Sequence, residues 1–400
     1  MISSNTVFST RFSLLINFIY LLFAFDSLFK ISLLGIKIHI GVILILIVNF
    51  LSIITRPRFN FDFFKHHFFY ILFALYLFFN GLFLTGISSL FMYFYFFLAT
   101  NVLFFIYRNS TYISNNTIRY FQYILILTGL LQFFIFYFFG YQISFIDAEH
   151  YNKGYSVAER LRGFFVEPNW FSIAITFNTL LLIKNDLIGF TKRYLFLIIL
   201  TFIVFVLNGT FGLALVLFLF YFRRYLFKNF IVSIGMILVV LFGLFYVTNQ
   251  RASFKANSSN IQLLNTATRI IPLYRTIEYL SDKSLVNKFF GVGFGTWGEV
   301  AIKNNISLLT KEVDFMKRGA SEVPVLIFEL GIFGVLLFVI DIIYLFCISK
   351  KEDAYLRAAL VLFLFSLFLY PIFKFFMYMV YYFLVRVLII RGHNTAKLCK

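Results

Sequence analysis

The feature that most constrains this chain is a succession of long apolar segments, separated by short polar stretches, that runs through nearly all of its 400 residues. A helix that crosses a lipid bilayer needs roughly 20 mainly apolar residues, and on that rule the chain contains about twelve candidate spans. They lie near 12–29, 38–54, 68–84, 88–107, 120–140, 168–184, 194–208, 210–222, 230–248, 323–346, 354–370 and 372–390. The sequence therefore predicts an all-α, polytopic integral membrane protein that forms a single domain over residues 1–400.

The composition excludes most other classes of protein. Hydrophobic residues make up 61% of the chain and charged residues only 13%, which is too apolar for a water-soluble fold. The net charge of +18 would suggest a nucleic-acid partner in a soluble protein, but in a membrane protein basic residues mark the cytoplasmic loops. We therefore expect no nucleic-acid partner, and the two cysteines have no spacing typical of a metal site.

The distribution of Lys and Arg between alternate loops predicts the orientation of the chain. If the N-terminus is cytoplasmic, the short outer loops carry only Lys30 and Lys37. The short inner loops carry many more basic residues: Arg56, Arg58, Lys65, Arg108, Arg119, Lys184, Lys192, Arg193, Arg223, Arg224, Lys228, Lys350 and Lys351. Because basic residues favour the cytoplasmic side, both termini are predicted to be cytoplasmic.

Two connections, residues 141–167 and 249–321, are much longer than the rest, and both fall on the external side. Long loops in compact folds are usually functional or disordered. The second loop contains apolar residues at helical spacing between Ile261 and Leu280, so we expect short helices that lie over the membrane face. The two loops are the predicted site.

The end of the first long loop is unusually polar for this chain. It reads "AERLRGFFVEPNWFSIAI" from Ala158 to Ile175. Pro168 suits the first position of a helix, so the helix begins on the external side with its positive dipole end outward. Arg160 and Arg162 precede it, and their guanidinium groups match phosphate oxygens. The stretch predicts an anion site at the membrane interface, although both Arg residues could instead bind lipid headgroups and Glu167 could pair with one of them.

The second long loop adds Arg269 and Arg275, followed by "GVGFGTW" at 291–297. No strand precedes that glycine-rich run, so it is not a dinucleotide-binding motif, and we interpret it as a closely packed turn. The loop ends at "GASEVPVLIFELGIFGVLLF", where Ser321 or Glu322 can cap another inward-running helix. Two helices thus begin on the same face, each with a Glu near its start.

In this order, "RLRG", "EPN", "GVGFG" and "ELGIFG" resemble the O-antigen polymerase family within the O-antigen polymerase and ligase superfamily. The resemblance covers roughly 158–338. It implies an enzyme of lipopolysaccharide biosynthesis in the bacterial inner membrane, which transfers a glycan from undecaprenyl pyrophosphate onto a new lipid-linked repeat unit by inverting glycosyl transfer. It also implies that no metal or cofactor is needed, and that a chain-length regulator and a flippase are partners besides the membrane lipids.

By position, the resemblance makes Arg160 or Arg162, together with Arg269, the pyrophosphate contacts, with Arg275 as a further candidate. Glu167 and Glu322 are candidates for the general base, because desolvation near the interface can raise a carboxyl pKa. Either Glu could instead be a helix cap or an Arg partner.

Two departures from the family bear on the assignment. Ligases of the superfamily carry a His at the start of the helix after the long external loop, whereas this chain has no His between His150 and His393. This favours a polymerase over a ligase. An Arg that often follows the turn between the seventh and eighth spans is replaced by Phe211 in "NGTFGLAL".

An alternative from another class is a flippase for lipid-linked oligosaccharides or another transporter. A transporter is expected to have broken helices and charges near the bilayer midplane, whereas the polar residues noted here lie mainly in two external loops. Asp26 and Lys374 are charges expected to face the bundle interior or a watery cavity, although both could equally snorkel to the interface. His66 and His67 are expected to be ordinary loop residues.

Overall fold

The computed structural model of the chain describes residues 4–25, 28–33, 36–55, 61–85, 90–141, 161–165, 168–184, 187–208, 261–301, 303–306, 321–350, 353–369 and 376–398. Most of these residues are helical. The α-helices are α1 (Ser4–Leu22), α2 (Ile40–Thr55), α3 (Phe61–His66), α4 (Phe68–Leu84), α5 (Leu90–Asn109), α6 (Asn115–Phe139), α8 (Pro168–Ile183), α9 (Leu187–Asn208), α12 (Ile261–Ser281), α13 (Leu285–Phe290), α14 (Glu322–Ile348), α15 (Ala354–Leu369) and α16 (Phe376–Leu398). Short helical turns occur at η1 (Phe23–Phe25), η3 (Ser110–Tyr112) and η5 (Trp297–Ala301).

The expectation of a purely α fold needs one correction, because a small hairpin joins α1 and α2. Strands β1 (Lys30–Leu33) and β2 (Ile36–His39) pair antiparallel, with Lys30 opposite His39. Alternating Ile and polar residues in "KISLLGIKIH" explain the pairing. The hairpin occupies the connection that was expected to be only a short outer loop.

Two helices of the described chain are long and apolar enough to cross a membrane, namely Asn115–Phe139 and Glu322–Ile348. Shorter apolar helices include Phe68–Leu84 and Ile40–Ile54. The predicted spans at 210–222 and 230–248 lie outside the described residues, as does Pro371 between the last two predicted spans. The structure therefore establishes a mainly helical, strongly apolar fold, while the count of twelve spans stays a prediction.

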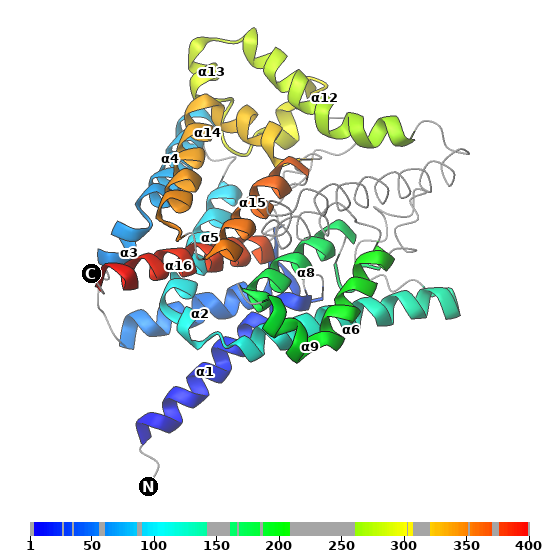
Figure 1. Cartoon of the computed structure of the whole chain (residues 1–400). Coiled ribbons are helices and arrows are strands. Elements are labelled where there is room, and N and C mark those ends of the chain that lie inside the picture. The colour runs from blue at the N-terminus through cyan, green and yellow to red at the C-terminus, as the bar shows by residue number, and fades with distance from the viewer. Residues whose placement is uncertain are drawn as a thin grey trace, which may run out of the picture.

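The helices form one connected bundle in which α16 contacts α5, α14, α15 and α8. On one side, α4 and α14 run next to each other, and α12 and α13 cover the end of the molecule where α14 begins (Figure 1). On the other side, α8 packs against α6 and α9, while α1 projects away from the body (Figure 1). The predicted amphipathic segment is thus a helix, α12, and it contacts α14.

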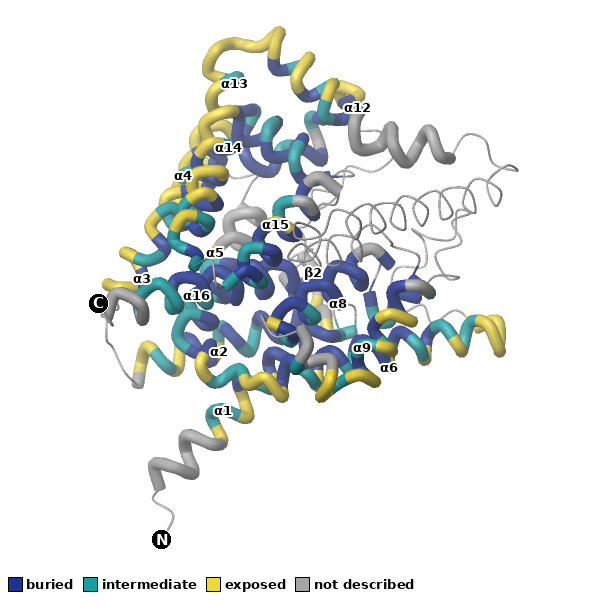
Figure 2. The backbone as a smooth tube through the Cα atoms, viewed as in Figure 1, coloured by how far each residue is buried: buried dark blue, intermediate teal, exposed yellow. Residues whose placement is uncertain are grey.

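Burial separates the central helices from the outer ones. Every described side chain of α16 from Met377 to Val387 is buried, and so are those of α8 from Trp170 to Asn178. By contrast, α4, α14 and the end of α6 carry exposed apolar side chains along their outer faces (Figure 2). A helix that is apolar all round, such as α16 or α8, belongs inside a bundle. The broad exposed apolar surface of α4, α14 and α6 can be accommodated by a surrounding lipid phase.

Side-chain amides and hydroxyls tie the helices together inside this apolar body. Thr117 of α6 donates to Asn17 Oδ1 of α1 over 2.6 Å, and Asn49 of α2 donates to the Asn101 carbonyl of α5 over 2.8 Å. A third hydrogen bond joins α8 to α6, where Asn178 donates to Gln122 Oε1. Such bonds are a common means of holding helices together in membranes, because each buried polar group needs a partner.

Candidate functional site

The segment before α8 is held by side chains from two neighbouring helices. The Asn208 amide at the end of α9 donates both to the Leu161 carbonyl and, over 2.8 Å, to the Pro168 carbonyl. The Arg162 backbone N–H donates to Gln132 Oε1 of α6 over 2.9 Å. One amide group therefore bridges the two ends of the turn, which places Arg162 close to the first residue of α8.

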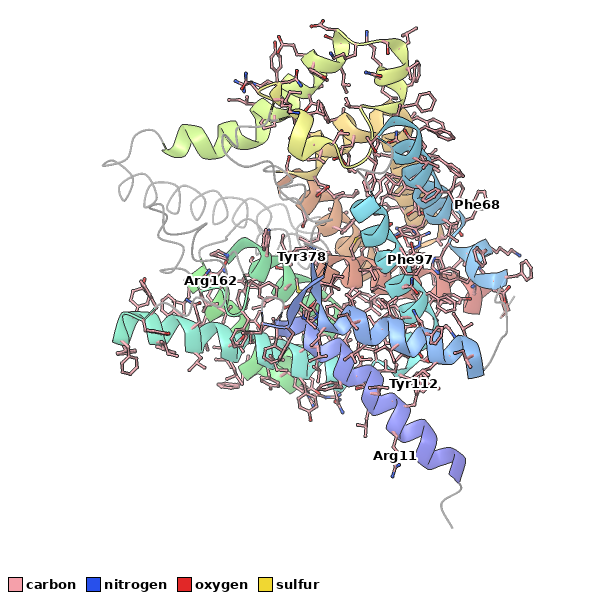
Figure 3. The ribbon with its side chains drawn as sticks, turned by 180° about the vertical axis from the view of Figure 1, so that it is seen from behind. Arg11, Phe68, Phe97, Tyr112, Arg162 and Tyr378 are labelled. Atoms are coloured by element: carbon pink, nitrogen blue, oxygen red, sulfur yellow. The ribbon has the colours of Figure 1, made fainter. Side chains whose placement is uncertain are left out.

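Arg162 itself is buried, with 8% of its surface exposed, and it lies in the turn before α8, beside α6 (Figure 3). By comparison, Arg11 on α1 points away from the body (Figure 3). A buried guanidinium is costly unless charged or polar groups surround it. Pro168 is the first residue of α8, as predicted. Arg160 and Glu167 lie outside the described residues, and so does the Asn169 side chain.

The start of α14 holds the second candidate carboxylate. Ser321 occupies the N-cap position with extended backbone, although its side chain makes no capping bond. Glu322 follows as the first helical residue and is fully buried. The predicted position of this Glu at a helix start is thus confirmed, while its role as a general base stays a prediction.

Helix α12 brings a basic residue to the same end of the molecule. Arg275 Nη1 donates to the Asn305 carbonyl, and Tyr279, one turn later, packs on Phe328 of α14 with ring centroids 5.6 Å apart. Thr276, between them in sequence, is completely buried. Arg269 lies on α12, but its side chain is outside the described part of the chain.

The glycine-rich run is a closely packed turn, as predicted, and the reason is a break in α14. The helix leaves helical geometry at Gly331, where φ is 63°. This break frees carbonyl groups one turn earlier, and the loop supplies their donors: Val292 N–H to Phe328 O over 2.8 Å and Gly293 N–H to Glu329 O over 3.1 Å. Gly291, Gly293 and Gly295 all have positive φ, which only glycine adopts at little cost.

Helix α4 completes this packing with two polar residues. Tyr76 donates to the Leu330 carbonyl over 2.7 Å, and Asn80 both donates to the Phe290 carbonyl and accepts the Phe294 N–H over 2.8 Å. Glu329 accepts the Trp297 N–H over 3.0 Å. The loop is therefore fixed between α4 and α14 by bonds that the sequence analysis did not anticipate. Glu329 was missed although it stands inside "ELGIFG" as a carboxylate within a predicted span, which is itself a signal of a polar contact.

The candidate residues consequently fall into two groups. Arg275, Glu322 and Glu329 lie at the α12 end of α14, whereas Arg162 is held among α6, α8 and α9. Helices α8 and α14 both contact α15 and α16.

A third polar group lies in the interior, and sequence reasoning missed it. The Arg386 guanidinium of α16 forms an ion pair with Asp341 Oδ2 of α14 and donates through Nε to His67 Nδ1 over 2.8 Å. Tyr382 donates to the same Asp341 oxygen over 2.8 Å. His67, Asp341 and Arg386 are 0 to 1% exposed, so the expectation that His67 is an ordinary loop residue is wrong.

The signal for this interior group was a charge inside each of two predicted spans, Asp341 in 323–346 and Arg386 in 372–390. The two charges that were expected to face the interior, Asp26 and Lys374, lie outside the described residues. Among the residues that the structure describes, no group of three or more His, Cys, Asp or Glu side chains is arranged to hold a metal ion.

No protein-family model matches this chain, and a search of curated proteins also finds no match.

Proposed function

We propose that the protein is a polysaccharide polymerase of the bacterial inner membrane. It transfers a growing glycan from undecaprenyl pyrophosphate onto a new lipid-linked repeat unit at the external face. The observation that carries this proposal is the buried Arg162 beside the first turn of α8. A permanent cation and the positive end of a helix, placed together, favour an anion such as a pyrophosphate.

The surroundings of the chain agree with a lipid-linked substrate. Helices α6 and α14 are long and apolar enough to span a bilayer, and exposed apolar side chains cover the outer faces of α4, α14 and α6. The proposal retains about twelve spans with both termini cytoplasmic, as the loop charges predict.

The chemistry follows from the candidate side chains. An acceptor hydroxyl attacks the anomeric carbon, the bond from that carbon to the pyrophosphate oxygen breaks, and the hydroxyl proton passes to a carboxylate. Arg162 or Arg160, together with Arg269, neutralises the charge that develops on the leaving group, with Arg275 as a further contact. Glu322 is the buried candidate for the proton acceptor, and Glu167 is the other.

A flippase or transporter is the second candidate function, because the Asp341–Arg386 ion pair places charges within helices. A transporter would also be expected to expose backbone carbonyls at a helix break as ion ligands. At the break in α14, the carbonyls of Phe328, Glu329 and Leu330 instead accept bonds from protein donors. This observation favours a structural role for the break.

The proposal can be tested with purified protein in liposomes that contain an undecaprenyl-pyrophosphate-linked repeat unit from the source strain. We expect longer glycans and released undecaprenyl pyrophosphate in the presence of EDTA. Arg162→Ala should abolish elongation. Arg119→Ala is the matched control, because Arg119 lies near the opposite end of α6, where it donates to Tyr194 over 3.0 Å. Movement of the lipid-linked unit across the bilayer without elongation would overturn the proposal.

A further inference from the structure

The interior group of His67, Asp341, Tyr382 and Arg386 joins α4, α14 and α16. The hydrogen bonds within the group do not satisfy all of its buried polar atoms. Arg386 donates through Nε to His67 and through Nη1 to Asp341. Tyr382 donates to the same oxygen, Asp341 Oδ2, that accepts from Arg386. His67 Nε2, Asp341 Oδ1 and Arg386 Nη2 are buried, and within the described chain none of the three has a hydrogen-bond partner.

The hydrogen bonds decide what each of these atoms can offer. His67 Nδ1 accepts from Arg386 Nε, so the proton of the neutral imidazole is on Nε2, which is therefore a donor. Arg386 Nη2 is also a donor, and Asp341 Oδ1 is an acceptor. A ligand here has to both accept and donate hydrogen bonds.

The charge of the group limits the ligand further. Asp341 and Arg386 neutralise each other, and His67 is uncharged in the tautomer that accepts from Arg386. A cation bound next to Asp341 would be repelled by Arg386, and an anion bound next to Arg386 would be repelled by Asp341. The Arg386 guanidinium carbon also lies 5.5 Å from the centre of the Tyr70 ring, which covers one face of the cation. A small, neutral ligand with both donor and acceptor capacity fits this balance, and water is that ligand.

Polar residues also connect the group to the edge of the bundle. His66, next to His67 at the end of α3, lies 3.1 Å from the Asn394 amide of α16, and both side chains are half-buried. Lys65, one residue earlier, is exposed. Exposure thus falls from the end of α3 toward the interior group, along side chains that can hydrogen-bond to water.

We propose that His67, Asp341 and Arg386 bind internal water between α4, α14 and α16, and that this water enters from the end where α3 meets the C-terminal part of α16. Buried polar groups in proteins are satisfied by protein or by ordered water, and ordered water does so in membrane helix bundles as well. The water site does not depend on which reaction the protein catalyses.

Hydroxyl-radical labelling tests this site, because brief radiolysis of water oxidises side chains that lie next to it. The full chain in lipid nanodiscs would be irradiated in ¹⁸O-water. The labelling rate of each residue would then be divided by the labelling rate of the same residue in the unfolded chain. Phe121 and Phe177 are the controls, since both are 1% exposed in the same bundle. We expect His67 and Tyr382 to incorporate label faster than these two, and to lose that excess in the Asp341→Leu/Arg386→Met double variant.

Two results would overturn the proposal. One is labelling of His67 and Tyr382 no faster than Phe121 and Phe177 in the unmodified chain. The other is an excess that persists in a double variant whose control phenylalanines stay protected. If the double variant unfolds, its control phenylalanines become labelled, and the comparison within the unmodified chain alone decides.

Discussion

The backbones of Gly291 and Gly331 cross so closely that a Cβ atom on Gly331 would lie 2.4 Å from the Gly291 amide nitrogen. Both residues have positive φ, 79° and 63°. This contact seats the glycine-rich loop against the break in α14 and so fixes the end of the helix that carries Glu322 and Glu329.

Gly331→Ala is therefore expected to destabilise the fold by about 2 to 5 kcal/mol, because a backbone clash is added to the strain of a positive φ. Thermal unfolding in detergent, followed by tryptophan fluorescence, measures the effect. Gly140→Ala is the control, since Gly140 has φ 64° but no atom within 4 Å of its Cβ position. Equal losses in the two variants would mean that the crossing is not tightly packed.

Asn80→Ala should loosen the loop without unfolding the bundle, because Asn80 bonds both the Phe290 carbonyl and the Phe294 N–H. Loss of the bond to the buried Phe294 N–H is expected to cost about 1 to 3 kcal/mol. Amide hydrogen exchange over residues 290–301 should accelerate, while α16 stays protected. Asn304→Ala is the control, since Asn304 bonds only the Val300 carbonyl within its own turn. Unchanged exchange in Asn80→Ala would contradict the assignment.

The contributions of Asp341 and Arg386 to the stability of the fold should depend on each other. Asp341→Leu or Arg386→Met alone leaves a buried, uncompensated charge and is expected to cost about 3 to 5 kcal/mol, whereas the double variant should recover much of that loss. A double-mutant cycle from denaturant unfolding measures the coupling. Additive losses would show that the two side chains do not form a coupled pair.

The stability of the protein should fall in mild acid through His67. Burial, with Arg386 and His66 nearby, lowers the pKa of His67 to about 2. The unfolded chain takes up a proton at this residue as pH falls below about 6.5, whereas the folded chain does not, so stability decreases by up to about 1.4 kcal/mol per pH unit below that value. Melting temperatures of the unmodified chain and of His67→Gln, compared between pH 7.5 and pH 5.0, test this. The unmodified chain should lose more stability than the variant, and an equal loss in both would refute the prediction.

Hydropathy was enough to predict where most described helices lie, because long apolar runs such as those of α6 and α14 have few alternatives to helix. The turn at Gly291 and the helix start at Pro168 were also predictable, since glycine and proline restrict the backbone in known ways. The hairpin at β1 and β2 was missed because a four-residue alternation is hidden among apolar neighbours.

Contacts between distant segments could not be predicted from local patterns. Asn208 bonds Leu161 and Pro168 from 47 and 40 residues away in sequence, and Asn80 bonds Phe294 across 214 residues. The interior ion pair also depends on how α14 and α16 pack. Of the candidate site residues, the side chains of Arg162, Arg275 and Glu322 are described, while those of Arg160, Glu167 and Arg269 are not.

The most direct test of the proposed function is the length of the surface polysaccharide, resolved on a gel, in a strain that lacks the gene. The strain would be complemented with the unmodified chain, Arg162→Ala or Arg119→Ala at matched membrane levels. We predict lipid core capped by a single repeat unit in the null strain and with Arg162→Ala, and a full ladder with the unmodified chain and with Arg119→Ala. A null strain with no capped core at all would contradict the polymerase assignment, because repeat units would then fail to cross the membrane or to be ligated.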